Sequence, residues 1–259
     1  MPFVDSFGRA VRKIRLSVTD RCNFRCTYCL PEEPVWLPRR ELLSFEELER
    51  VARVLVPHGV AKIRLTGGEP LLRRDLPRLV ARLATIPGLE GLSITTNGYH
   101  LGQQAKPLRE AGLRSVTVSL DGLDAATVDA LARRACFNRI QAGIRAALAA
   151  GFAPIKINCV IVRGVNEHQI EGFAELARSG PYVVRFIEFM PLDSGGTWDM
   201  SRVVTGAEIR QRIEARFAIE RVSSGAPGPD AARDPASRWR FRDGPGEIGF
   251  ISSVSEPFC

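Results

Sequence analysis

Strand-like and helix-like segments alternate along most of this chain, and that alternation limits its possible folds more than any other feature. Stretches of period-two hydrophobicity at 13–19, 60–66 and 91–97 are each followed by sequence with helical periodicity or by a loop that leads into it. Six such strands precede Pro191. Strands that alternate with helices form βα crossovers and a mainly parallel sheet. We therefore expect an α/β fold.

The ends of several elements can be predicted from local signals. Ser44 and Glu47 form a capping-box pattern at the start of one helix, and Gly59 follows its apolar stripe. The segment 223–237, rich in Ser, Gly and Pro, is expected to be a mobile linker before short strands near Trp239 and Phe250.

The expected strands are 13–19, 60–66, 91–97, 114–121, 153–162 and 182–190. The expected helices are 44–59, 74–85, 103–111, 125–133, 138–150, 168–179 and 205–217.

The two faces of the expected strands differ in polarity. One face is apolar, as in Ile63 and Leu65, whereas the other is polar and partly cationic. A sheet with helices on both sides should be apolar on both faces, so the asymmetry favours an incomplete (β/α)6 TIM-like barrel, at 1–200, with a partial C-terminal extension at 201–259. The polar set is Arg15, Ser17, Arg64, Thr66, Ser93, Thr95, Asn97, Thr117, Ser119, Asp121, Lys156 and Asn158.

Three cysteines follow the first expected strand within eight residues. Cys22, Cys26 and Cys29 stand at Cys-x3-Cys-x2-Cys spacing, too close together for ordinary core packing. Three thiolates fit a 4Fe–4S cluster with one iron left open to an exogenous ligand, because a closed zinc or ferredoxin-type site needs four ligands. The spacing alone also allows a zinc site with a distant fourth ligand, or a disulfide with a spare thiol.

The composition of the chain limits the cellular compartment and the classes of partner that we expect. The chain of 259 residues has six cysteines, no charged leader with an apolar stretch, and no membrane-length apolar run, so we expect a cytoplasmic protein without a membrane partner. Its net charge of +7 favours anionic partners. The arginines are scattered, and charge alone cannot choose between nucleic acid and a phosphate-bearing small molecule.

Further motifs are expected at the same ends of successive strands. Thr66 to Pro70 reads T-G-G-E-P, and Ser119 and Asp121 belong to an S-L-D sequence. Parallel α/β enzymes place their chemistry at strand C-termini. Together with the cysteine loop, these motifs are similar to those of radical S-adenosylmethionine enzymes. With I-R-L-T-G-G-E-P-L-L-R-R-D-L, T-T-N-G, I-K-I-N-C-V, R-F-I-E-F-M-P and I-G-F-I-S-S-V-S-E-P-F-C, the whole chain resembles the GTP 3′,8-cyclase family.

That resemblance implies roles for individual residues. Cys22, Cys26 and Cys29 would hold a 4Fe–4S cluster whose open iron binds S-adenosyl-L-methionine. The residues implied to line the S-adenosylmethionine pocket are Tyr28, Gly68, Ser119 and Met190. The residues implied to contact GTP are Arg15, Arg64, Thr95 and Lys156, all of which belong to the polar strand faces.

The resemblance also implies a reaction and its partners. The expected activity is conversion of GTP to 3′,8-cyclo-7,8-dihydro-GTP, the first step of molybdenum cofactor biosynthesis. We expect GTP as the substrate, an electron donor of unknown identity, cyclic pyranopterin monophosphate synthase as the next enzyme of the pathway, and a homodimer. A nucleic-acid partner is not expected.

The chain departs from the family pattern at Cys259. In the family this residue begins a second 4Fe–4S cluster that continues through further cysteines, whereas the sequence here stops at its first ligand. We expect Cys136 and Cys159 to be structural, because Cys159 lies on an apolar strand face and Cys136 lies between helices. The sequence thus predicts one cluster in this chain and impaired cyclisation of GTP.

Two other functional classes remain open at this point. A different radical S-adenosylmethionine enzyme, such as one that modifies a peptide, would share the cysteine loop without needing a cationic lumen. A zinc-containing nucleic-acid-binding module would be colourless, and its binding would depend strongly on salt.

Overall fold

The computed structural model describes residues 2–192, 196, 198–222 and 236–256 of the chain. Packing divides the chain into two compact units, each built from separate segments. The first unit comprises Met1–Asn23, Val35–Thr117 and Arg139–Phe152, and the second comprises Phe24–Pro34, Val118–Asn138 and Ala153–Cys259.

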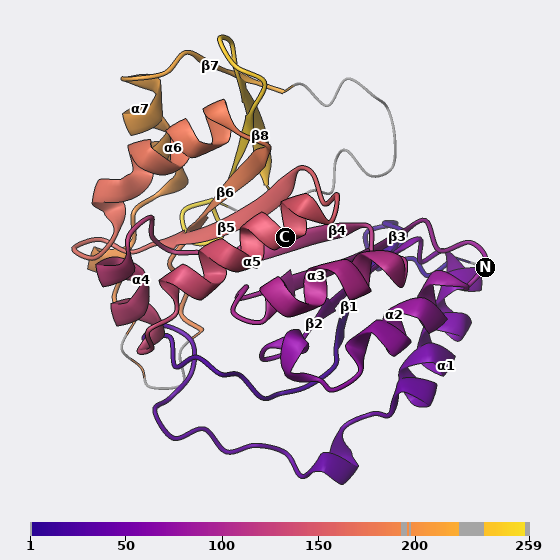
Figure 1. Ribbon diagram of the computed structural model, residues 1–259. Coiled ribbons are helices and arrows are strands. Elements are labelled where there is room, and N and C mark those ends of the chain that lie inside the picture. The colour runs from indigo at the N-terminus through magenta and orange to yellow at the C-terminus, as the bar shows by residue number, and fades with distance from the viewer. Residues whose placement is uncertain (1, 193–195, 197, 223–235, 257–259) are drawn as a thin grey trace. The chain divides into compact units, whose positions relative to one another are not determined.

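The first unit contains three parallel strands with helices packed on them (Figure 1). The strands are β1 (Lys13–Ser17), β2 (Lys62–Thr66) and β3 (Gly91–Thr96). The helices are α1 (Phe45–Leu55), α2 (Leu76–Ala84), α3 (Leu101–Glu110) and most of α5 (Phe137–Ala149), with short 3-10 helices η1 (Arg39–Glu41), η2 (Val56–His58) and η3 (Pro70–Leu72). Each strand is therefore joined to the next through helical sequence.

Local signals explain where α1 begins and ends. The Ser44 side chain accepts a hydrogen bond from the Glu47 N–H, and the Glu47 carboxylate accepts one from the Ser44 N–H. This reciprocal pair satisfies two N–H groups that the first helical turn cannot pair internally. Gly59, with φ of 100°, then ends the helical segment in a left-handed conformation that glycine adopts without strain. The capping-box and stop predictions are both confirmed.

The polarity difference between strand faces appears as alternating burial. In β2, Ile63 and Leu65 are buried while Arg64 is half-buried, and in β5 (Ile155–Ile161) every second residue is buried. The buried faces pack against helices through residues such as Leu79 and Leu83 of α2. The polar faces of β2 and β5 remain partly accessible, as the sequence predicted, whereas Thr117 on the predicted polar face of β4 is only 2% exposed.

The second unit holds the remaining sheet. Strand β4 (Ser115–Ser119) crosses from the first unit into the second. The other strands are β5, β6 (Tyr182–Glu188), β7 (Ile219–Arg221), β8 (Ser237–Phe241) and β9 (Glu247–Ile251). The helices are α4 (Ala125–Ala132), α6 (Ile170–Ser179) and α7 (Gly206–Glu214), with η4 (Glu167–Gln169) and η5 (Met200–Arg202).

Parallel and antiparallel pairing meet in the second unit. Strands β5, β6 and β9 pair in parallel, whereas β8 pairs antiparallel with β9 and with β7. Phe173 of α6 packs with Phe186 of β6 and Phe250 of β9 in a buried aromatic cluster, with Phe186 and Phe250 stacked at 5.8 Å between ring centroids. The sequence predicted β8 and β9 but not β7, whose three residues are too few to give a periodic pattern.

The buried Glu188 carboxylate joins three parts of the second unit. It accepts hydrogen bonds from the Gly206 N–H at 2.7 Å, the Val254 and Ser255 N–H groups at 2.8 Å, and the Ser255 hydroxyl at 2.5 Å. Glu188 is only 1% exposed. Four donors offset the cost of burying this charge, so the end of β6, the start of α7 and the segment after β9 are held together.

The order of elements confirms the α/β prediction, with six strands, each followed in the chain by one or more helices, as in a partial (β/α) barrel. Among the helices that the structure describes, none has both the length and the hydrophobicity of a membrane span.

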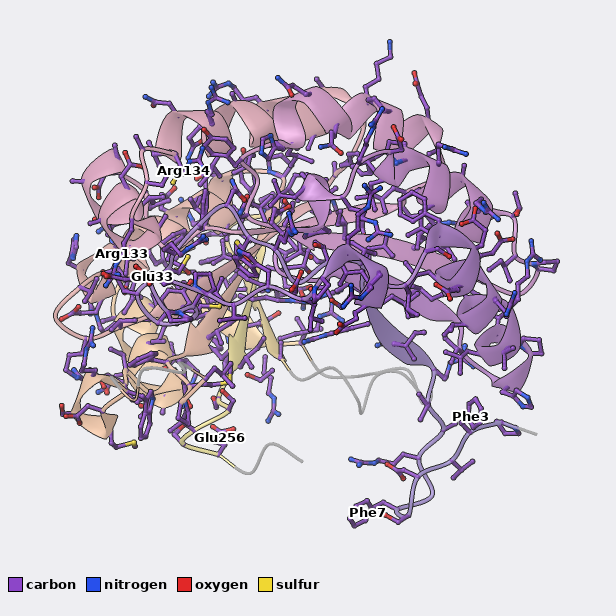
Figure 2. The ribbon with its side chains drawn as sticks, turned by 90° about the horizontal axis from the view of Figure 1, so that it is seen from below. Phe3, Phe7, Glu33, Arg133, Arg134 and Glu256 are labelled. Carbon is purple, nitrogen blue, oxygen red and sulfur yellow. The ribbon has the colours of Figure 1, made fainter. Side chains whose placement is uncertain are left out.

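Figure 2 shows Phe7, 80% exposed, at the tip of the small N-terminal arm closed by the Val4–Ala10 bridge. The domain boundary at residue 200 stays a prediction, and the expected linker at 223–237 falls mostly outside the described residues.

Two glycines in helices of the first unit give a matched test of its packing. A Cβ on Gly143 of α5 would lie 2.5 Å from the Gly98 carbonyl oxygen, whereas a Cβ on Gly102 of α3 would have no neighbour closer than 3.9 Å. We expect Gly143→Ala to lower the free energy of unfolding by about 1–3 kcal/mol. Gly102→Ala should raise it by about 0.5–1 kcal/mol, because alanine is the better helix former.

Urea denaturation followed by circular dichroism measures both changes. Equal effects of the two substitutions would contradict the close approach of α5 to the Gly98 turn.

Candidate functional site

The Gly67–Gly68–Glu69 segment lies against the backbone that leads into the cysteine loop. The Gly68 N–H donates to the Thr19 carbonyl, and the Glu69 N–H donates to the Arg21 carbonyl, both at 2.7 Å. A Cβ at either glycine would overlap the backbone of residues 19–21. Gly67 also has φ of 154°, a conformation that side chains disfavour. The paired glycines therefore allow two backbones to pack without side chains between them.

Glu69 is a buried carboxylate, and both of its oxygens accept hydrogen bonds. Its Oε1 accepts from the Leu71 N–H at 3.0 Å and the Thr96 hydroxyl at 2.6 Å, and its Oε2 accepts from the Asn97 N–H at 2.7 Å. Burial raises the pKa of Glu69, and these hydrogen bonds oppose that effect. Glu69 therefore fixes the T-T-N-G motif at the end of β3 rather than presenting a free carboxylate.

Asn97 extends this arrangement to the first cysteine. Its side-chain Nδ2 donates to Asn23 Oδ1 at 2.9 Å and lies 4.0 Å from Cys22 Sγ. The Asn97 Oδ1 atom accepts from the Tyr99 N–H at 3.0 Å, which fixes the orientation of the side-chain amide. Three motifs that are separate in the sequence thus meet at Cys22 within one unit. Sequence reasoning missed the link because its partners lie up to 75 positions apart.

The polar strand face of the first unit is cationic. Arg15 of β1 lies directly opposite Arg64 of β2, which in turn lies opposite Ser93 of β3. Thr95, on the same face of β3, is half-buried. Two arginines in neighbouring register positions give this face a positive charge, and a positive charge favours an anionic ligand.

In the second unit, Cys26 and Cys29 belong to one turn. The Cys29 N–H donates to the Cys26 carbonyl at 3.0 Å. The residues on either side of Cys26 are bonded to the end of α4, because the Arg25 and Thr27 N–H groups donate to the Ala132 and Leu131 carbonyls. Just beyond the turn, Glu32 forms an ion pair with Arg133, which Figure 2 labels at the end of α4. The two cysteines are therefore presented by a braced turn.

Tyr28 is held by Asp121 in the same unit. The Tyr28 hydroxyl donates to Oδ2 of Asp121, and the Val160 N–H donates to Oδ1 at 2.8 Å. Asn166 also fixes the segment, since its amide donates to the Asp121 main-chain carbonyl at 2.7 Å. Burial raises the pKa of Asp121 to about 6, although the hydrogen bonds from Tyr28 and Val160 lower it. The S-L-D motif thus positions the aromatic residue that precedes Cys29.

Other predicted residues of the second unit lie on its polar strand face. Lys156 and Asn158 are half-buried on β5, and Asn158 lies opposite Arg185 of β6. The Asn158 Oδ1 atom is buried and accepts no hydrogen bond from the described residues, which leaves it able to accept one from a ligand. Ser119 and Met190 are half-buried near the ends of β4 and β6.

Arg185 was not among the predicted site residues. The β6 segment did not give a clear pattern in sequence, since Val183 and Ile187, on the face of Arg185, are apolar. Pairing with Asn158 on one side and Gly249 on the other places Arg185 in the polar row. Its positive charge, compared with the polar residues on the other strands, was the sequence signal that could have identified Arg185.

The three cysteines predicted to hold a cluster belong to separate units, Cys22 to the first and Cys26 and Cys29 to the second, and the described residues contain no group of three or more Cys, His, Asp or Glu side chains close enough to hold a metal ion. Cys22 and Cys26 are half-buried, Cys29 is exposed, and each of the three carries a thiol rather than a disulfide sulfur. Burial, followed by the charge of Asp121, raises the pKa of Cys29, so iron must displace its proton on binding. Cys136 and Cys159 are 2% and 0% exposed and belong to the core. Cys259, the predicted ligand of a second cluster, lies outside the described residues.

Comparison with known proteins identifies the family. Residues 16–177 match the model of the radical SAM superfamily, and residues 182–259 match Molybdenum Cofactor Synthesis C. A GTP 3′,8-cyclase of Acidothermus cellulolyticus is 50% identical over all of this chain and 72% of its own length. The chain belongs to the GTP 3′,8-cyclase family. A further member, from Geobacter sulfurreducens, is 46% identical over all of this chain and 78% of its own length.

Solved structures support the fold of this GTP 3′,8-cyclase family member. The structure of anSMEcpe with bound AdoMet aligns with a TM-score of 0.60 at 15% identity, covering 79% of this chain and 59% of that one. Streptococcus suis SuiB aligns with a TM-score of 0.58 at 19% identity, covering 79% and 45%. Radical SAM enzymes use an iron–sulfur cluster with S-adenosylmethionine, and the family therefore defines the cofactors of this chain in general terms.

The raised pKa of Asp121 predicts a pH dependence of stability. Its pKa of 3.8 in the unfolded chain rises to about 6 on folding, so the folded state binds the proton more tightly. The stability this carboxyl contributes is present below pH 3.8 and is lost as the pH rises through about 6. Relative to Asp121→Asn, the wild type should lose about 1–3 kcal/mol between about pH 4 and pH 7, the smaller value allowing for partial exposure.

Urea unfolding of the two proteins across that pH range measures the difference. Tyr28→Phe removes a donor that lowers the Asp121 pKa, so its loss of stability should be larger than that of the wild type. Parallel stability curves for the wild type and Asp121→Asn would contradict the assignment.

Proposed function

We propose that this chain converts GTP to 3′,8-cyclo-7,8-dihydro-GTP in the first step of molybdenum cofactor biosynthesis. The carrying observation is 50% identity to a named GTP 3′,8-cyclase across the whole chain, with both family models matched. The arginine pair on β1 and β2 supports an anionic substrate independently of that likeness.

Cys22, Cys26 and Cys29 would hold one 4Fe–4S cluster, leaving an iron open for S-adenosylmethionine. When bound, the cluster and S-adenosylmethionine supply one-electron chemistry that removes a hydrogen atom from an unactivated carbon of the substrate. Tyr28, held by Asp121, and Gly68, packed on the loop backbone, would line the S-adenosylmethionine site.

The chain's own residues contribute binding, orientation and exclusion of water. Arg15, Arg64 and Lys156 would bind the triphosphate, since guanidinium groups bind phosphate oxygens in pairs and an ammonium supplies a point charge. Thr95 would add a hydroxyl contact to the nucleotide, and Ser119 and Met190 would shape the neighbouring cofactor pocket. Holding the substrate in one orientation lowers the entropic part of the reaction barrier.

Iron content tests the ligand set. Replacing Cys22, Cys26 and Cys29 together with alanine should remove about four iron atoms per chain after anaerobic reconstitution. Cys159→Ala, at a buried cysteine of β5, serves as the control and should keep the wild-type iron content. Iron retained by the triple variant would rule out this site. A wild-type content near four supports a single cluster, whereas a content near eight contradicts it.

Nucleotide binding tests the substrate assignment. We expect Lys156→Ala to weaken GTP binding about 10- to 100-fold, because a charge-assisted hydrogen bond to phosphate contributes about 1.5–3 kcal/mol. Lys106→Ala is the matched control, since Lys106 on α3 is 82% exposed and paired only with Glu110. Calorimetry with GTP and, separately, with S-adenosylmethionine distinguishes loss of the substrate site from general damage. Unchanged GTP affinity in Lys156→Ala would contradict the proposed role.

A further inference from the structure

A cationic pocket of about 460 Å³ lies in the first unit, apart from the polar strand face. It is formed by the residues after β1, by η1 and the start of α1, and by the chain from the end of η3 to the start of α2. Five arginines line it: Arg21, Arg39, Arg73, Arg74 and Arg78. None of them belongs to the residues proposed to bind GTP or S-adenosylmethionine.

The positive charge of this arginine pocket is poorly balanced. Arg21, Arg39 and Arg78 form no ion pair with any residue in the described part of the chain. Arg74 is 92% exposed and only 3.6 Å from Asp75. The one carboxylate that lines the pocket, Glu46, is already paired with Arg82. An acidic partner would therefore find unpaired guanidinium groups.

Arg73 is different, because it is fixed in place. It donates to the Leu43 carbonyl at 2.8 Å and lies 5.2 Å from the centre of the Phe45 ring. Leu42, Phe45 and the 37%-exposed Leu72 line the pocket together with the arginines. A lining that combines apolar and aromatic side chains with several arginines is typical of a protein-binding surface rather than of a phosphate-binding site.

The pocket adjoins the proposed cluster along the chain. Arg21, in its wall, directly precedes Cys22, so their Cα atoms are about 3.8 Å apart. The backbone at this point is fixed, because the Arg21 carbonyl accepts from the Glu69 N–H and the Asp20 carboxylate accepts from the Leu37 N–H at 2.6 Å. A protein seated on the pocket would contact a rigid segment beside the first cluster ligand.

We infer that this arginine pocket docks the electron donor of the enzyme, an acidic one-electron carrier protein. The inference rests on the proposed function, which consumes an electron that the chain cannot itself provide. In the transfer, one electron leaves the reduced carrier, which is oxidised, and enters the cluster, which is reduced. No bond forms or breaks in this step. Charge complementarity at such a surface raises the rate of productive encounter.

Charge reversal in the pocket tests the inference. The probe is a reduced acidic flavodoxin, mixed anaerobically with the reconstituted chain, and cluster reduction is followed by stopped-flow absorbance. The Arg39→Glu/Arg78→Glu double variant should show at least a tenfold lower second-order rate constant at low salt, with a weaker dependence on ionic strength. Arg145→Glu, an exposed arginine of α5 that does not line the pocket, should keep the wild-type rate.

Dithionite, a small reductant that needs no docking surface, separates docking from damage. The double variant should be reduced by dithionite, and should then cleave S-adenosylmethionine, at wild-type rates. An unchanged rate with flavodoxin, or an equal loss with both reductants, would overturn the inference. Tight pyrophosphate binding that the double variant loses would instead assign the pocket to a small anion and also overturn it. Failure of S-adenosylmethionine cleavage in the wild type with dithionite would count against the proposed function and not against the docking surface.

Discussion

The other contacts in the first unit's site depend on the hydrogen bonds of the buried Glu69 carboxylate. It is 1% exposed, and its three hydrogen bonds join the turn after β2 to the motif after β3. A buried charge is tolerated only when its hydrogen-bonding capacity is satisfied. The Glu69 N–H also donates to the Arg21 carbonyl. Glu69 therefore links the ends of two strands to the start of the cysteine loop, and the paired glycines leave room for the two backbones to pack together.

Polar groups in the second unit follow the same principle with different partners. Asp121 holds Tyr28 beside Cys29, and Asn166 holds the Asp121 backbone. In both units a carboxylate acts behind the residues that would contact a ligand. This separation of roles is typical of precise sites, in which the contacting groups are oriented by a second layer of hydrogen bonds.

Much of this architecture could be predicted from the sequence because its causes are local. The Ser44 capping box, the Gly59 stop and the alternation in β2 each depend on a few neighbouring residues. The contacts of Glu69 and Asp121 could not be predicted this way, since their partners lie 28 and 93 positions away. Strand β7 was missed because three residues carry no measurable period, and Arg185 because its apolar neighbours concealed the polar face.

Family resemblance supplied what periodicity could not, namely the identity of the cofactors and the substrate class. It did not supply the arginine pocket, because no motif connects Arg21, Arg39 and Arg78. Such a surface depends on where three separate segments fold, and on which of their charges remain unpaired. Only the distribution of ion pairs in the folded chain distinguishes these arginines from the many that have partners.

The four hydrogen bonds to Glu188 also bear on how this family can diverge. They connect β6 to the start of α7 at Gly206 and to Val254 and Ser255. The segment after β9 therefore cannot be replaced independently of β6. A recombinant that joined this chain's β6 to a foreign C-terminal segment would bury a carboxylate without its donors. Crossovers between relatives should therefore survive only when Glu188 and its donors are inherited together.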